Sequence, residues 1–74
     1  MQLTVILVGP FKLGRFQEEV REYPPATCAR DVIAELQVPM PLLGTVLING
    51  IHAGIEDLLH DGDTVCLLPF MDGG

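Results

Sequence analysis

The sequence predicts an α+β domain, a mixed sheet of four to five strands with one main helix packed on one face. Short apolar runs near both ends of the chain predict strands, and a helical pattern separates them. Turn residues punctuate these segments. A length of 74 residues suffices for one domain. We therefore expect a single domain over residues 1–74, with a flexible C-terminal tail from about residue 70 to 74.

The N-terminal part predicts a hairpin. Residues 2–8 are apolar and β-branched, as in a central strand. A turn-rich stretch between Gly9 and Gly14 follows, and residues 15–23 predict a second, more solvated strand. Pro24-Pro25 ends that strand.

One amphipathic helix of about two to three turns is expected next. Thr27 is the predicted N-cap. Pro39 and Pro41 end the helix, because proline cannot continue the backbone hydrogen bonds. The apolar face, which can cover a sheet, consists of Cys28, Ala29, Val32, Ile33 and Leu36.

The second half predicts a further hairpin and a final strand. Residues 45–48 form the third strand, Asn49-Gly50 is a strong turn signal, and residues 51–53 pair back. Residues 55–60 predict a short helical or irregular connector.

The last strand follows a turn at Asp61-Gly62-Asp63 and covers residues 64–68. Pro69 is expected to end its pairing. The resulting order of strand, strand, helix, strand, short strand, strand is that of the β-grasp (ubiquitin-like) fold, with the first and last strands adjacent in the centre.

Alternation along the last strand divides its side chains between the two faces of the sheet. Val65 and Leu67 are expected to face the helix. The opposite face then carries Cys66, Leu68 and Phe70, joined by Ile6 and Val8 from the first strand. An uncovered apolar face of this kind is typical of a protein interface.

Composition and motifs exclude several function classes. The formal charge is −6, which disfavours nucleic acid and anionic membranes as partners. The apolar N-terminus lacks a basic region and a cleavage site, so we expect a cytoplasmic protein. Cys28 and Cys66 have no CxxC spacing, which favours free, mostly buried thiols. His52 and His60 lie in no compact ligand spacing, so no metal and no bound cofactor are expected.

The last third of the chain carries a resemblance to a known family. The segment from Leu58 to Gly74 combines the DGD turn, a hydrophobic strand, Pro69 and a terminal Gly73-Gly74. It resembles the MoaD/ThiS family of ubiquitin-like sulfur carriers, in which these features occur in this register. Residues 46–50 look like the penultimate hairpin of that family. The end that contains Pro69 is closer to the branch of the molybdopterin synthase small subunit.

The resemblance implies a reaction at the terminal carboxylate. Gly74 would be adenylated by an activating enzyme that uses ATP, and sulfur would then displace AMP to give a thiocarboxylate. Gly73 and Gly74 suit a narrow channel because they have no side chains. The chain would be a protein substrate rather than an enzyme, and it could serve as the small subunit of a molybdopterin-synthase-like complex.

Two kinds of partner follow from the same resemblance: an adenylating enzyme related to ubiquitin-activating enzymes, and the large subunit of a synthase that accepts the sulfur. The residues expected to bind them surround the tail: Phe70, Leu68, Met71, Asp72 and Ile6. Asp72 and the short segment between Gly9 and Gly14 depart from typical relatives.

These departures leave the pathway open. Molybdopterin or tungsten-pterin synthesis, thiamine thiazole synthesis and another sulfur-containing metabolite are the alternatives. A ubiquitin-like protein modifier and a plain β-grasp interaction module are the other function classes. The sulfur donor, the oligomeric state and any redox role of the cysteines also stay open.

Overall fold

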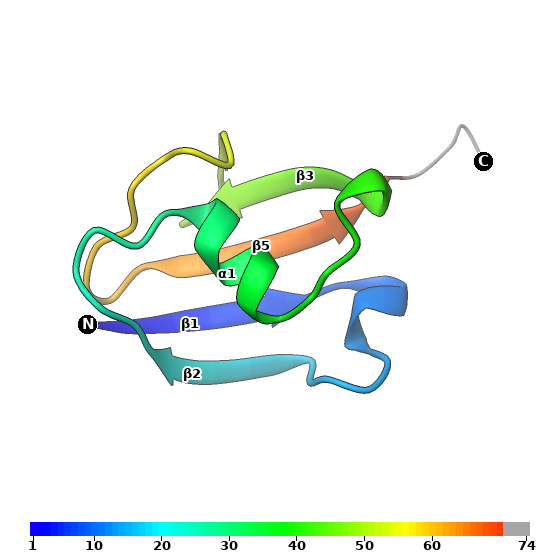
Figure 1. The fold of residues 1–74 in the computed structure, drawn as a ribbon, viewed down its shortest axis with the longest axis horizontal. Coiled ribbons are helices and arrows are strands. Elements are labelled where there is room, and N and C mark those ends of the chain that lie inside the picture. Colours follow the sequence, from blue (N-terminus) through cyan, green and yellow to red (C-terminus); the bar gives the residue numbers. More distant parts are fainter. Residues whose placement is uncertain (71–74) are drawn as a thin grey trace.

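The computed structural model describes residues 1–70, which form a five-stranded mixed sheet with one α-helix on one face (Figure 1). This is the predicted β-grasp fold. In chain order the elements are β1 (Gln2–Leu7), the 3₁₀ turn η1 (Gly9–Lys12), β2 (Glu18–Glu22), α1 (Ala29–Glu35), the 3₁₀ turn η2 (Met40–Leu42), β3 (Leu43–Ile48), β4 (Ile51–Ala53) and β5 (Thr64–Pro69).

The strands are ordered β2-β1-β5-β3-β4. β1 and β5 run parallel in the middle, with Val5 opposite Val65, and the remaining pairs are antiparallel. The prediction that the first and last strands lie side by side is confirmed. The turn between β3 and β4 is also as predicted, because Asn49 and Gly50 have φ values of 53° and 81°, the left-handed geometry of a tight hairpin.

The hydrophobic core lies between α1 and the sheet. Alternate residues along β1 and along β5 as far as Leu67 are buried, which places one set of side chains under the helix. Val65 and Leu67 belong to this set, as predicted. The buried apolar residues are Leu3, Val5, Leu7, Phe11, Tyr23, Ala29, Val32, Ile33, Val38, Val46, Leu59, Val65 and Leu67.

The beginning of α1 corrects the sequence prediction by one residue. Cys28, not Thr27, is the N-cap, and the Asp31 carboxylate accepts a hydrogen bond from the Cys28 N–H at 3.0 Å. That bond lowers the pKa of Asp31. Thr27 is buried instead, and its hydroxyl donates to the Pro24 carbonyl at 2.7 Å. The hydroxyl therefore stabilises the loop before the helix rather than the helix itself.

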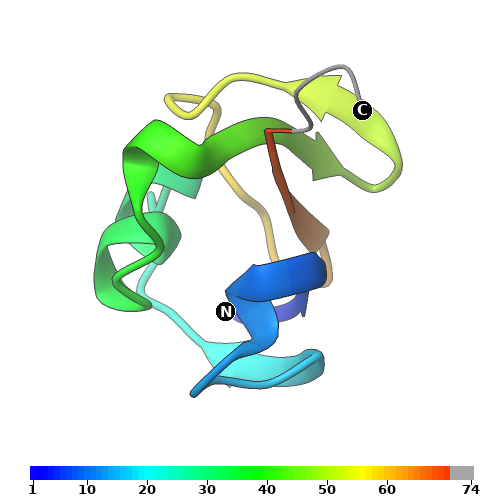
Figure 2. The same ribbon diagram turned by 90° about the vertical axis from the view of Figure 1, so that its right-hand side faces the viewer.

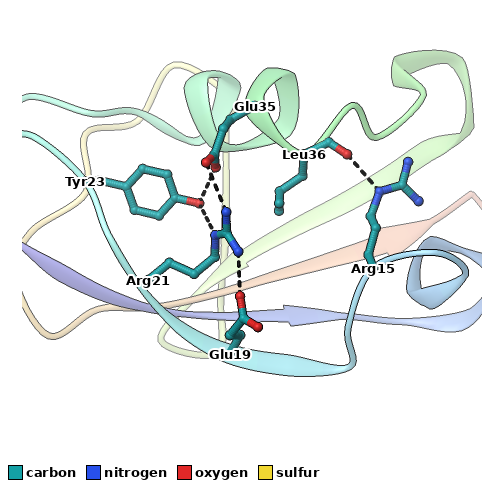
Figure 3. A network of polar contacts seen from close by, with 6 residues as sticks. All are labelled: Arg15, Glu19, Arg21, Tyr23, Glu35 and Leu36. Atoms are coloured by element: carbon teal, nitrogen blue, oxygen red, sulfur yellow. Dashed lines mark hydrogen bonds and ion pairs between the residues drawn. The ribbon is translucent and has the colours of Figure 1, made fainter.

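A polar network joins the end of α1 to β2 (Figure 3). The hydroxyl of Tyr23 donates to Glu35 at 2.7 Å, and Arg21 lies 3.0 Å from the same carboxylate. Arg21 also pairs with Glu19 and stacks on Phe16, 5.4 Å from the ring centre. Burial and the bond to Glu35 raise the pKa of Tyr23 to about 12, so the phenol remains a donor at neutral pH.

Arg15 closes the other end of this junction. Its guanidinium donates to the Leu36 carbonyl at 2.7 Å (Figure 3). It also donates to the Gln37 carbonyl at 2.8 Å. Carbonyls at the end of a helix have no partner within the helix, and Arg15 supplies one. β2 starts at Glu18 and not at residue 15, because Arg15 turns toward the end of the helix. Gln17 still continues the hairpin by one bond, since its carbonyl accepts a hydrogen bond from the Leu7 N–H at 2.9 Å.

The connector between β4 and β5 is irregular, so of the two predicted alternatives the helical one is wrong. Cys28 and Leu58 form an isolated bridge, and the N–H of Leu59 donates to the Thr27 carbonyl at 2.9 Å. These contacts hold the connector against the start of α1 and bury Leu59. Both cysteines are free, as predicted, although each is half-buried rather than mostly buried.

Candidate functional site

The face of the sheet that points away from α1 is apolar at its centre. Seen along the sheet in Figure 2, the helix lies to one side of the strands, and no described segment covers the other. The side chains that alternate with the core residues point to this uncovered side and are half-buried. We call this surface the open face and define it by Ile6, Leu47, Cys66 and Leu68, with Val8 next to the end of β1.

The strand register aligns three residues of the open face in one row across the centre of the sheet. Cys66 of β5 lies between Ile6 of β1 and Leu47 of β3. Burial among apolar neighbours raises the pKa of the Cys66 thiol, so it packs as a small apolar group rather than as a thiolate. Sequence reasoning placed Ile6, Cys66 and Leu68 on this face. It missed Leu47, whose alternation with the buried Val46 is the signal that could have found it.

Polar groups border this apolar row at both edges of the sheet. Glu18 of β2 lies opposite Ile6, and His52 of β4 lies opposite Leu47. Val20, on the same face as Glu18 and Glu22, is largely exposed. An apolar centre with acidic groups along one side is suited to a protein partner that presents apolar residues flanked by basic ones.

The tail begins at a point that the backbone fixes firmly. Pro69 lies opposite Leu43 in the β3–β5 ladder, and the N–H of Phe70 donates to the Leu42 carbonyl at 2.6 Å. The prediction that Pro69 ends the pairing is therefore wrong. Proline lacks an N–H, but its neighbour still offers one, so the pairing continues through Phe70. We call Pro69 and Phe70, with residues 42–44 at the end of η2 and the start of β3 beside them, the tail root.

The backbone of Phe70 is held by its hydrogen bond to Leu42, but the residue is 66% exposed. Leu42 and Met40, in the neighbouring η2 turn, are also exposed. An exposed aromatic side chain at the point where the chain leaves the sheet offers an anchor for a partner. Met71, Asp72, Gly73 and Gly74, which were predicted to take part, lie outside the described residues.

The DGD turn at residues 61–63 fixes the start of β5. The Asp63 carboxylate accepts hydrogen bonds from the Asn49 amide at 2.9 Å and from the His60 N–H at 2.8 Å. These bonds lower the pKa of Asp63, and the amide of Asn49 is the main cause. The DGD turn therefore ties the β5 start to the β3–β4 hairpin, which is a structural role.

Residues 1–70 contain no metal site and no pocket. No three histidine, cysteine or acidic side chains in this range are grouped so that they could hold a metal ion. The same residues contain no helix long and apolar enough to cross a membrane.

Comparisons with known proteins give structural matches alone. No family model and no curated protein matches the sequence. Among solved structures, the putative molybdopterin converting factor subunit 1 of Pyrococcus furiosus is 24% identical, with a TM-score of 0.75 over 93% of this chain and 97% of its own. A chain from the complex of subunits 1 and 2 of the Helicobacter pylori molybdopterin-converting factor is 23% identical, with a TM-score of 0.68 and full coverage of both chains.

The small archaeal modifier protein SAMP1 of Haloferax volcanii is 17% identical, with a TM-score of 0.75 and full coverage of both chains. Identities this low establish a shared fold, here over nearly the whole length of each protein. The matches agree with the resemblance to the MoaD/ThiS family, whose branch they do not resolve.

Proposed function

We propose that this protein is a sulfur carrier that is activated at the carboxylate of Gly74. The observation that carries the proposal is the Gly73-Gly74 end, in the register of the family, behind a strand whose last residues are held by β3. The similarity to two molybdopterin converting factor structures supports molybdopterin or tungsten-pterin synthesis as the pathway. The proposed location is the cytoplasm.

The proposed chemistry belongs to partners that act on this chain. In the first step a carboxylate oxygen of Gly74 attacks the α-phosphorus of ATP, pyrophosphate leaves, and an acyl adenylate forms. In the second step a hydrosulfide-level sulfur attacks the acyl carbon. The bond to AMP breaks, AMP leaves with its electron pair, and the sulfur loses its proton to solvent. The product is a thiocarboxylate, which is the sulfur nucleophile in the next reaction.

The open face and Phe70 are the proposed docking surface. Ile6 and Leu68 contribute apolar area, and the exposed ring of Phe70 contributes the anchor next to the tail. Met71 and Asp72 are proposed to contact the partner as they enter its site. The partners are an adenylating enzyme and a synthase large subunit, and the complex of two subunits from Helicobacter pylori supports the second.

Intact-mass measurement tests the proposal. The protein is incubated with candidate adenylating enzymes, ATP and a sulfide source, and its mass should rise by the difference between a sulfur and an oxygen atom. Omission of ATP is the control for non-enzymatic modification. If no candidate enzyme produces the shift, the carrier function is refuted.

A second candidate function is protein modification, which the similarity to the small archaeal modifier protein favours. Both functions begin with the same adenylate, so loading alone does not separate them. They differ in the bond that follows, because a modifier forms an amide to a lysine amine of another protein. Recovery of this chain from cells as a free thiocarboxylate supports the carrier, whereas branched peptides that end in Gly73-Gly74 on lysine support the modifier.

A further inference from the structure

Gly44 of β3 lies at a close backbone approach to Pro69 and Phe70, at the end of β5. A Cβ atom at this position would lie 2.7 Å from the Phe70 Cα, 2.8 Å from the Phe70 N and 2.9 Å from the Pro69 carbonyl oxygen. All three are backbone atoms, so no side-chain rotation relieves the overlap. Gly44 is not among the glycines with positive φ. Glycine is therefore required here for space and not for a special backbone conformation.

The contacts around Gly44 determine how the chain leaves the sheet. The β3–β5 register shifts between Leu43 and Thr45, which makes Gly44 the site of a bulge. Two residues before Gly44, the Leu42 carbonyl accepts the hydrogen bond from the Phe70 N–H. On the other side of the tail root, an added Cβ at Gly9 would be 3.4 Å from the Pro69 ring. The end of β5 is thus held between η1 and the start of β3 (Figure 1).

We propose that Gly44 is a positioning residue for the reaction at Gly74. By letting the two backbones approach, it fixes the position of Phe70, where the tail starts, relative to the open face. The inference rests on the proposed function, since the position of this starting point matters only if Gly74 reacts in a partner that is docked on that face.

The size of the effect follows from the geometry. Ordinary van der Waals contact begins at 3.4 Å, so a methyl group at position 44 must push the Phe70 Cα outward from 2.7 Å. This displacement breaks or lengthens the 2.6 Å bond between Phe70 and Leu42. Misplacement of a reacting group by about 1 Å can lower a rate by about a hundredfold. We expect at least a tenfold lower kcat for adenylation, on the order of that misplacement effect.

Gly44→Ala tests the proposal, with Gly54→Ala as the matched control. Gly54 also lacks a positive φ, and its added Cβ would meet only the Asp57 carboxylate at 3.8 Å. Pyrophosphate release with the activating enzyme gives kcat and KM separately, and amide hydrogen exchange reports the bond from Phe70. For Gly44→Ala we expect lower kcat at saturating partner and faster exchange at Phe70; a rise in KM can accompany them, because the displaced Phe70 belongs to the docking surface, so kcat is the deciding quantity. The control should match wild type in all three.

Two results overturn the inference while leaving the proposed function intact. One is a wild-type kcat for Gly44→Ala, and the other is a raised KM with kcat unchanged, which would indicate lost docking. Absence of adenylation of the wild-type protein refutes the proposed function, and the inference with it.

If Gly44→Ala does not fold, Phe70→Pro and Phe70→Ala provide the same test from the other strand. Both variants lack the aromatic ring, but only proline also lacks the N–H that donates to Leu42. The proposal requires kcat to be at least about tenfold lower for Phe70→Pro than for Phe70→Ala. Equal kcat values for the two variants contradict it.

Discussion

Truncation of Phe70 to alanine separates docking from folding. A phenylalanine side chain buries about 150–250 Å² when it is fully enclosed. With 66% of Phe70 exposed, on the order of 100–160 Å² of that area remains available to a partner. At about 25 cal/mol per Å², this area corresponds to roughly 2.5–4 kcal/mol as an upper limit. After the cost of ordering the interface, we expect a loss of about 1–3 kcal/mol, or about 5- to 150-fold in Kd.

The effect of the same substitution on folding should be smaller. The buried third of the ring contributes roughly 1–2 kcal/mol by the same area relation. Phe11 is the comparison, because it is only 2% exposed, and its truncation should cost about 3–5 kcal/mol. Isothermal calorimetry with the activating enzyme measures the first quantity, and urea unfolding of both variants measures the second. If Phe70→Ala binds normally, or destabilises the protein as much as Phe11→Ala, the assignment of Phe70 to the interface is wrong.

Three further predictions concern the tail, the open face and acid stability. Deletion of Gly73-Gly74 should abolish the mass shift without lowering Tm, and a large loss of Tm would mean that the tail is packed. Bound partner should slow alkylation of Cys66, measured by mass spectrometry at pH 8; unchanged labelling would place docking elsewhere. The hydrogen bond from Tyr23 lowers the pKa of Glu35. This interaction therefore stabilises the fold above pH 4.5, the ordinary pKa of the carboxyl, and the stabilisation is lost as the pH falls through the lowered pKa. Glu35→Gln should therefore lose less Tm than wild type below pH 4.5, and identical profiles would exclude this contribution.

The fold could be predicted because its signals are local and repeated. Alternation along residues 64–68 assigned the two faces of β5, and Asn49-Gly50 fixed the position of one hairpin. Thr27 shows where such reasoning fails. Thr27 and Cys28 are adjacent, and the choice of N-cap was decided by Asp31, whose side chain reaches Cys28, and by the burial of Thr27 against the loop.

The tail root was harder to predict because its geometry depends on residues that are distant in sequence. Pro69 suggested the end of a strand, but the partner of Phe70 is a carbonyl at Leu42, which no local pattern reveals. Gly44 was overlooked for the same reason. A single glycine within an apolar run can mark a close backbone approach, but only the pairing of β3 with β5 shows which backbone approaches.

The parallel pairing of β1 with β5 has a consequence for the order of folding. Thr4 pairs with Thr64, so the central contacts of the sheet join segments at opposite ends of the sequence. Loops of this length close slowly, and local structure cannot substitute for them. A growing chain that lacks β5 exposes the inner edge of β1 and has no fixed origin for the tail. In a carrier of the proposed kind, the strand that completes the sheet is thus also the strand that holds the start of the tail in place.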